Sequence, residues 1–228
     1  MEKMQNSMMK RYKMFAGLGL IIVIIAFILS LSSADATSTF FSVDKVTREA
    51  AAAGTQIVAA NVTRHVLPHW IPSFKFLGLG IMLGAITMSL GVIIQTLRSL
   101  GIDVMSLWPK ELSPGAPEKP RSAKLFPMLM LMGWMLLIIG LIAAIATNGT
   151  VSAYWANSIS GVLNPAEAGS IYLDRLAIIK GVKPWLGALR FAGMSLLFTA
   201  ITVSLTVIIR TLQGQEKTLR NFIQARTS

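Results

Sequence analysis

Four long stretches of the chain contain only uncharged, largely apolar residues, and polar segments separate them. A helix needs about 20 such residues to cross roughly 30 Å of hydrocarbon. The uncharged stretches are Met14–Ser33, Phe76–Leu97, Leu125–Thr147 and Phe191–Ile209. The pattern predicts an all-α integral membrane protein with four transmembrane helices, at about residues 14–33, 74–97, 125–147 and 189–211.

Composition and charge agree with a membrane protein. Of the 228 residues, 54% are hydrophobic and only 14% are charged, and the mean hydropathy is +0.63. The net charge of +11 would suggest nucleic acid as a partner of a soluble domain. Here the basic residues flank apolar stretches, so we expect a lipid bilayer as the partner and no nucleic acid.

The distribution of basic residues predicts the orientation. Thirteen of the 21 Lys and Arg residues lie in the N-terminus, the middle loop and the C-terminus, and basic residues near span ends stay on the cytoplasmic side. We therefore expect both termini in the cytoplasm and the chain in the plasma (inner) membrane. Lys10, Arg11 and Lys13 precede the first stretch as in a signal peptide, but its apolar run is longer than usual, so we interpret it as a retained anchor.

The chain contains an internal duplication. Lys75–Leu97 aligns without a gap on Arg190–Leu212, and twelve of the 23 positions are identical. Each half then holds two spans, so the chain returns to its starting side and the two repeats are parallel. The predicted organisation is a first repeat (residues 1–98), a proline-rich cytoplasmic linker (99–124), a second repeat (125–213) and a cytoplasmic tail (214–228).

Each outer loop is predicted to contain an external helix. In the first half an alanine-rich run from about Val43 to Val66 ends before Pro68. In the second half the segment Asn164-Pro165-Ala166-Glu167 supplies helix-start signals, and Gly181 followed by Pro184 supplies a stop.

Small residues form a stripe on the second span of each half. In the bilayer, such residues let helix backbones approach closely. Their spacing of four, three and four residues places each set on one helix face. This placement predicts that spans two and four pack on each other. The alternative is that the hydroxyl groups line a path for a solute. The stripes are Gly80, Gly84, Thr87 and Gly91, and Ser195, Thr199, Thr202 and Thr206.

Few residues offer site chemistry. His65 and His69 are four residues apart. We interpret them as interfacial histidines in a polar loop; the alternative is the beginning of a copper or zinc site, which this spacing allows. Lys75 and Arg190 lie beside Trp70 and Trp185 at the outer span ends. We interpret these four as interfacial anchors; the alternative is a pair of cations that binds an anion or lipid headgroups.

These features favour a protein without catalytic activity of its own. The four stretches contain no ionisable residue, which disfavours active ion transport, and zero cysteines exclude thiolate chemistry. No cofactor is predicted apart from the alternative of a metal ion at the histidines. We expect an integral membrane subunit that scaffolds or stabilises a larger complex with other membrane subunits. The alternatives are a small-solute channel or carrier and a metal-bearing subunit of a membrane oxidoreductase.

Overall fold

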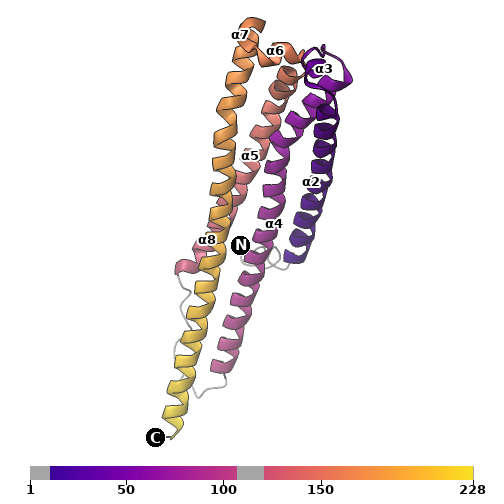
Figure 1. The fold of residues 1–228 in the computed structure, drawn as a ribbon. Helices are drawn as coiled ribbons and strands as arrows, with labels where there is room; N and C mark the ends of the chain where they lie inside the picture. Colours follow the sequence, from indigo (N-terminus) through magenta and orange to yellow (C-terminus); the bar gives the residue numbers. More distant parts are fainter. Residues whose placement is uncertain (1–10, 107–120, 228) are drawn as a thin grey trace. The chain divides into compact units, whose positions relative to one another are not determined.

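A computed structural model describes residues 11–106 and 121–227, and every element in these residues is a helix (Figure 1). Four of the helices are long and apolar enough to cross a membrane. The prediction of an all-helical membrane protein with four candidate spans is therefore confirmed. The elements are α2 (Tyr12–Phe41), α3 (Lys45–Glu49), α4 (Gln56–Ser106), η1 (Arg121–Lys124), α5 (Leu125–Trp155), α6 (Ile159–Leu163), α7 (Pro165–Ala168) and α8 (Ser170–Thr227).

The first outer loop is organised differently from the prediction. Instead of one helix from about Val43 to Val66, the structure has the five-residue α3, a turn, and then α4, which runs through Pro68 and Pro72 without a break. A proline removes one backbone donor but does not exclude a helix when neighbouring helices compensate. Helix α8 contacts this segment, where Arg190 Nη2 donates to the carbonyl of His69 at 3.4 Å.

In the predicted second outer loop the structure has only a four-residue helix at the predicted start signals, and no helix ends at the predicted stop. Pro165 is the first residue of α7, which ends after four residues, and α8 begins at Ser170. Helix α8 then passes through Gly181 and Pro184 and continues to Thr227. The tail from residue 214 is therefore helical as far as Thr227, and the linker from residue 99 begins as the end of α4. The proline-rich part of the linker, residues 107–120, lies outside the described residues.

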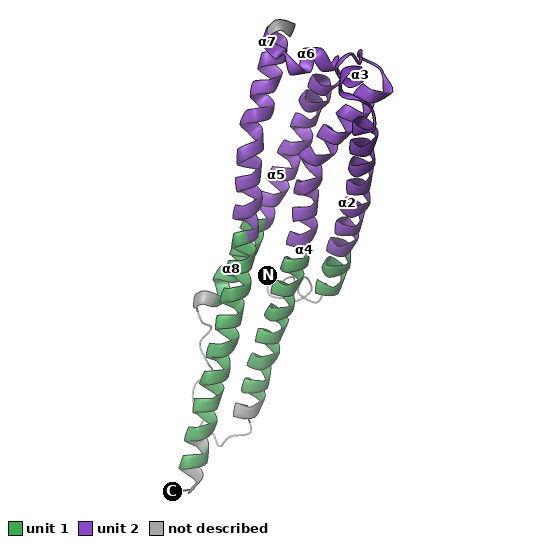
Figure 2. Cartoon of the chain, viewed as in Figure 1, with its two compact units in different colours: residues 1–17, 81–133, 195–228 green, residues 18–80, 134–194 purple. Residues whose placement is uncertain are grey.

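The chain divides into two compact units, and each contains segments of both predicted repeats (Figure 2). Unit 1 comprises residues 1–17, 81–133 and 195–228, and unit 2 comprises residues 18–80 and 134–194. The division therefore follows packing between helices and not the order of the halves along the chain.

In unit 2, α2 and α4 approach closely at Gly78. A Cβ atom built on Gly78 would lie 2.9 Å from the Cγ2 atoms of Ile22 and Val23 and 3.0 Å from the carbonyl oxygen of Gly19. Only a glycine fits at this distance without a shift of one helix.

Hydrogen bonds between side chains and backbone join α4, α5 and α8 within the same unit. Trp134 Nε1 donates to the carbonyl of Gly80 at 2.8 Å. Ser73 is fully buried, and its hydroxyl donates to the carbonyl of Gly140 at 3.3 Å and accepts from Arg190 Nε at 2.8 Å. Polar interactions therefore connect three helices inside a mainly apolar bundle.

Unit 1 has its own apolar cluster, contributed by α4, η1, α5 and α8. Its buried members are Ile94, Ala123, Phe126, Ala200 and Val207. At the far end of α4 the amide Nε2 of Gln215 donates to the carbonyl of Leu97 at 2.6 Å. These contacts fix α8 against α4 within this unit.

Candidate functional site

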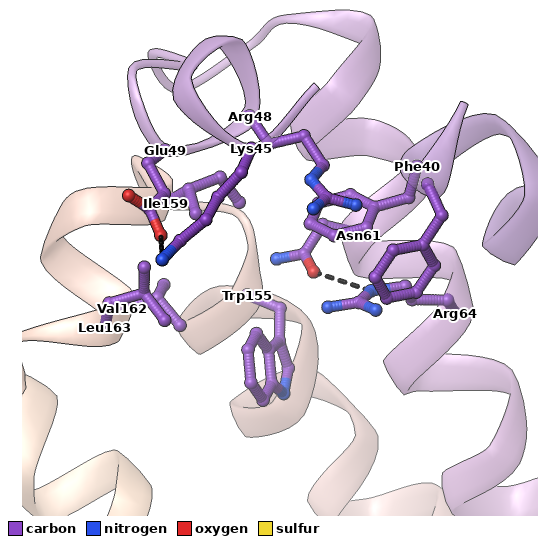
Figure 3. A pocket seen from close by; sticks show the side chains of 11 residues that line it. Phe40, Lys45, Arg48, Glu49, Asn61, Arg64, Trp155, Ile159, Val162 and Leu163 are labelled. Carbon is purple, nitrogen blue, oxygen red and sulfur yellow. Dashed lines mark hydrogen bonds and ion pairs between the residues drawn. The ribbon is translucent and has the colours of Figure 1, made fainter. Parts of the chain in front are cut away.

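Unit 2 ends in a small cap that contains a partly open cavity of about 200 Å³. The cap consists of five segments: the end of α2 (residues 36–41), the whole of α3, the turn and first part of α4 (residues 51–64), the end of α5 (residues 151–155), and the whole of α6. The cavity lies beyond the uncharged stretches, among aromatic, aliphatic and charged side chains (Figure 3). Its lining residues are Phe40, Phe41, Lys45, Arg48, Glu49, Asn61, Arg64, Trp155, Ile159, Val162 and Leu163.

Local sequence signals build the cap. Asp44 is the N-cap of α3: its carboxylate accepts from the backbone N–H of Thr47 at 3.0 Å and from the Thr47 hydroxyl at 2.6 Å. These hydrogen bonds lower the pKa of Asp44. Gly54, with φ +84°, supplies the left-handed turn between α3 and α4. The α3 segment is thereby turned back towards α4.

Contacts between α6 and the rest of the cap close the cavity. The backbone N–H of Ile159 donates to the carbonyl of Ala51 at 3.2 Å, and the hydroxyl of the buried Tyr154 donates to the carbonyl of Val162 at 3.0 Å. Apolar packing supports these hydrogen bonds, since Phe40, Ala51, Val58, Ala60 and Ile159 form one buried cluster. The cap is therefore a packed layer and not a loose loop.

Two arginines lie on the same pair of aromatic rings at the cavity. The guanidinium carbon of Arg64 is 3.8 Å from the centre of the Phe40 ring and 5.0 Å from that of Phe41. The corresponding distances for Arg48 are 5.3 and 4.8 Å. Such cation–π contacts hold a guanidinium while its N–H donors stay available.

Asn61 is the third polar group of the cavity. Only 1% of this residue is exposed, and its Oδ1 accepts from Arg64 Nε at 2.9 Å (Figure 3). Its Nδ2 is buried without a hydrogen-bond partner among the described residues. A buried amide donor without a partner is unfavourable, so this N–H group is available to a ligand.

The electrostatics of the cavity are positive. Burial and, second, the charge of Arg48 lower the pKa of Arg64, which reflects two cations held near each other. Glu49 is the only carboxylate in the lining, and it pairs with Lys45 at 3.7 Å. Within the described residues neither arginine forms an ion pair. An anion would therefore offset the repulsion between the two guanidinium groups.

The two histidines of the candidate metal site have different partners. The His65 ring stacks on Trp155 with ring centres 3.5 Å apart and planes 8° from parallel, and its Nε2 is buried without a hydrogen bond. His69 Nε2 shares a hydrogen bond of 2.7 Å with the Thr147 hydroxyl. Among the described residues there is no group of three or more His, Asp or Glu side chains that could hold a metal ion.

The two small-residue stripes are placed differently. Gly80, Gly84, Thr87 and Gly91 are all buried. Their counterparts on α8 are all exposed: Ser195, Thr199, Thr202 and Thr206. The opposite face of α8 packs against the rest of the protein. Its fully buried residues are Leu197, Ala200, Ser204 and Val207. The structure therefore does not bring the two stripes together.

The predicted interfacial anchors also differ among themselves. Trp70 is half-buried and packs edge-on against Phe74, with ring centres 6.0 Å apart, while Trp185 is 42% exposed. Lys75 is half-buried. Arg190 does not end in solvent, because its guanidinium bonds to Ser73 and to the backbone of His69. Arg190 is therefore a connection between helices, which the sequence analysis did not identify.

The cavity residues were likewise missed. In the sequence, Arg48 and Arg64 are two of the basic residues between the first two spans, and Asn61 belongs to Asn61-Val62-Thr63, a tripeptide that matches a glycosylation pattern. One signal was available: Asn61 and Arg64 are three residues apart in a helical run, which places both side chains on one face. Nothing in the sequence indicated that α3 brings Arg48 to the same place.

Comparison of the chain with protein-family models, with curated proteins and with solved structures finds no match.

Proposed function

We propose that this chain is a non-catalytic integral membrane subunit that scaffolds or stabilises a larger membrane complex. It lies in the plasma (inner) membrane with both termini in the cytoplasm, and its partners are other integral membrane subunits. The observation that carries the proposal is the exposed face of α8.

That face combines a stripe of small residues with large apolar ones. Ser195, Thr199, Thr202 and Thr206 are exposed, and the hydroxyls of the three threonines donate to carbonyls four residues earlier in α8, at 2.8–3.0 Å. Their polar groups are thus satisfied inside the helix. Exposed apolar side chains flank them at Phe191, Phe198, Leu205 and Ile209. An exposed face of small residues with satisfied hydroxyls, flanked by apolar side chains, suits close packing by a helix of another protein.

The duplication gives a second argument. The equivalent stripe on α4 is buried in the chain itself, so the same residue pattern serves helix packing in the first half. A partner helix on α8 would give the second half the same kind of contact. The four uncharged stretches also contain no ionisable group, which agrees with a packing role and not with transport chemistry.

The test is extraction of the chain from its native membrane in mild detergent, followed by blue-native electrophoresis and mass spectrometry. The wild type should comigrate with a larger membrane complex. Thr199→Leu with Thr202→Leu should release it, since larger side chains on the stripe keep a partner helix at a distance. Ala146→Leu is the matched control, because Ala146 is exposed on α5, outside the stripe, and should leave the complex intact.

A wild type that migrates alone or only with copies of itself would refute the scaffold proposal. Small-solute channel or carrier activity would then be the next proposal to test. Metal analysis of the same purified protein, with His65→Ala and His69→Ala for comparison, tests the third proposal; an unchanged metal content would reject it.

A further inference from the structure

The cap cavity offers hydrogen-bond donors on one side and apolar side chains on the other. The donors belong to Arg48, Arg64 and Asn61, and the apolar wall is formed by Trp155 and by three aliphatic residues of α6, Ile159, Val162 and Leu163. A ligand that satisfies both sides has acceptor atoms at one end and an apolar portion at the other.

The orientation of Asn61 defines the polar side. Arginine has no acceptor, so the contact with Arg64 Nε requires the oxygen Oδ1 to face Arg64. The amide nitrogen Nδ2 is then the group left without a partner. Because Asn61 is 99% buried and lines the cavity, Nδ2 is a donor held ready in a place that bulk water barely reaches.

The arginines define the charge of the ligand. Both guanidinium groups rest on the Phe40 and Phe41 rings, and the nearby carboxylate of Glu49 is paired with Lys45. Guanidinium groups match carboxylate and phosphate oxygens in geometry and form strong charge-assisted hydrogen bonds with them. The cavity volume of about 200 Å³ is below that of pockets for drug-sized molecules, so the apolar portion must be short.

We propose that the cap cavity binds an amphiphilic oxyanion, with its oxygens between Arg48, Arg64 and Asn61 Nδ2 and its short apolar chain against Trp155 and α6. This inference is independent of the scaffold proposal, because it concerns unit 2 outside the uncharged stretches and needs no partner subunit. The oxyanion can be a free carboxylate or phosphate ester, or the headgroup of an anionic lipid.

The test uses the full chain purified in a neutral detergent and 6-bromohexanoate as the probe. Its carboxylate represents the oxyanion, and its bromine quenches indole fluorescence at close range. We expect saturable quenching that disappears in Trp155→Phe, since no other tryptophan in the described part of the chain lines the cavity. The neutral analogue 6-bromohexanol should give no saturable quenching.

Three variants test the polar side. Arg48→Gln and Arg64→Gln should each weaken probe binding by about tenfold or more, because each removes charge-assisted hydrogen bonds. Asn61→Asp keeps an oxygen for Arg64 but replaces the free donor with a second oxygen, and should weaken binding at least as much. The matched control is Arg210→Gln, which removes the same charge from an exposed position on α8 and should leave binding unchanged.

The proposal is overturned if the bromohexanoate quenching does not saturate, if bromohexanol binds equally, or if Asn61→Asp and both arginine variants bind as the wild type does. An unchanged thermal midpoint shows that a variant is folded. Asn61→Asp is nearly isosteric and keeps the contact with Arg64, so it remains informative if an arginine variant fails to fold.

A second arm distinguishes the two sources. Nanodiscs of phosphatidylcholine alone are compared with nanodiscs containing phosphatidylglycerol. Weaker probe binding in the presence of phosphatidylglycerol indicates that a lipid headgroup occupies the cap cavity. Unchanged probe binding indicates that a free amphiphile occupies it. Dissociation of the complex by Thr199→Leu with Thr202→Leu leaves this binding unchanged, so the two proposals can fail separately.

Discussion

Replacement of Gly78 by alanine tests the close approach of α2 and α4. The added Cβ would lie 2.9 Å from two methyl groups and 3.0 Å from the carbonyl oxygen of Gly19. The methyl groups belong to the β-branched Ile22 and Val23, whose χ1 angles are restricted in a helix, and the carbonyl belongs to the backbone. None of these atoms can rotate away freely, so α2 must shift or the contact must open. Overpacking of this kind costs about 1–3 kcal/mol.

The helix preference of alanine partly hides this cost, because alanine stabilises a helix by about 1 kcal/mol relative to glycine. Gly17→Ala on α2 serves as the control, since a Cβ there meets no atom within 4 Å. The difference between the two variants cancels the helix preference and leaves the overpacking. We expect Gly78→Ala to unfold at lower denaturant than Gly17→Ala, with free energies of unfolding about 1–3 kcal/mol apart.

The assay is reversible unfolding of the purified chain in mixed micelles of mild detergent and sodium dodecyl sulfate, followed by circular dichroism. Equal stability of the two variants, to within about 0.5 kcal/mol, would refute the close approach of α2 and α4 at this position. A loss in Gly17→Ala alone would refute it as well.

Three further predictions use the same unfolding assay. Trp134→Phe removes the hydrogen bond to Gly80 and should cost about 0.6–1.7 kcal/mol, the range for such bonds in membranes; an unchanged stability would contradict this bond. Ser73→Ala and Arg190→Gln break the same hydrogen-bond network. In a double-mutant cycle their effects on the free energy of unfolding should differ from additivity by about 0.5–3 kcal/mol; strictly additive effects would show that the two residues do not interact. Burial, with the charges of Arg64 and Lys183, lowers the pKa of His65 to about 4. The free energy of unfolding should therefore fall as the pH drops from about 6.5 towards 4. His65→Phe should flatten the dependence of stability on pH in this range.

The spans could be predicted from the sequence because their signal is local. An uncharged run such as Leu125–Thr147 can satisfy its backbone hydrogen bonds within its own segment in hydrocarbon only as a helix. The ends of the helices could not be predicted in the same way. Pro68 and Pro184 are stop signals by local rules, yet α4 and α8 pass through them, since a proline removes only one backbone donor and is tolerated in helices of membrane bundles.

The candidate site could not be predicted because it depends on contacts between distant segments. Arg48 and Arg64 meet on the Phe40 ring only after α3 folds back over α4. The stripe on α8 shows a related limit. Its residues match the α4 stripe in spacing, and the sequence therefore predicted the same packing, but the face of α8 with Leu197 and Val207 is the one buried in the chain. Periodicity identifies a face and does not say which neighbour covers it.

The position of Ser73 has a consequence for the order in which the chain assembles during synthesis. Its hydroxyl donates to α5 and accepts from α8, and α8 leaves the ribosome after α4 and α5. Before α8 is synthesised, the hydrogen bond from Ser73 to the carbonyl of Gly140 can join α4 and α5, but the bond from Arg190 to Ser73 cannot form. Arrival of the fourth span therefore closes the bundle, and a chain truncated before α8 would present quality-control proteases with a three-helix intermediate that lacks this connection.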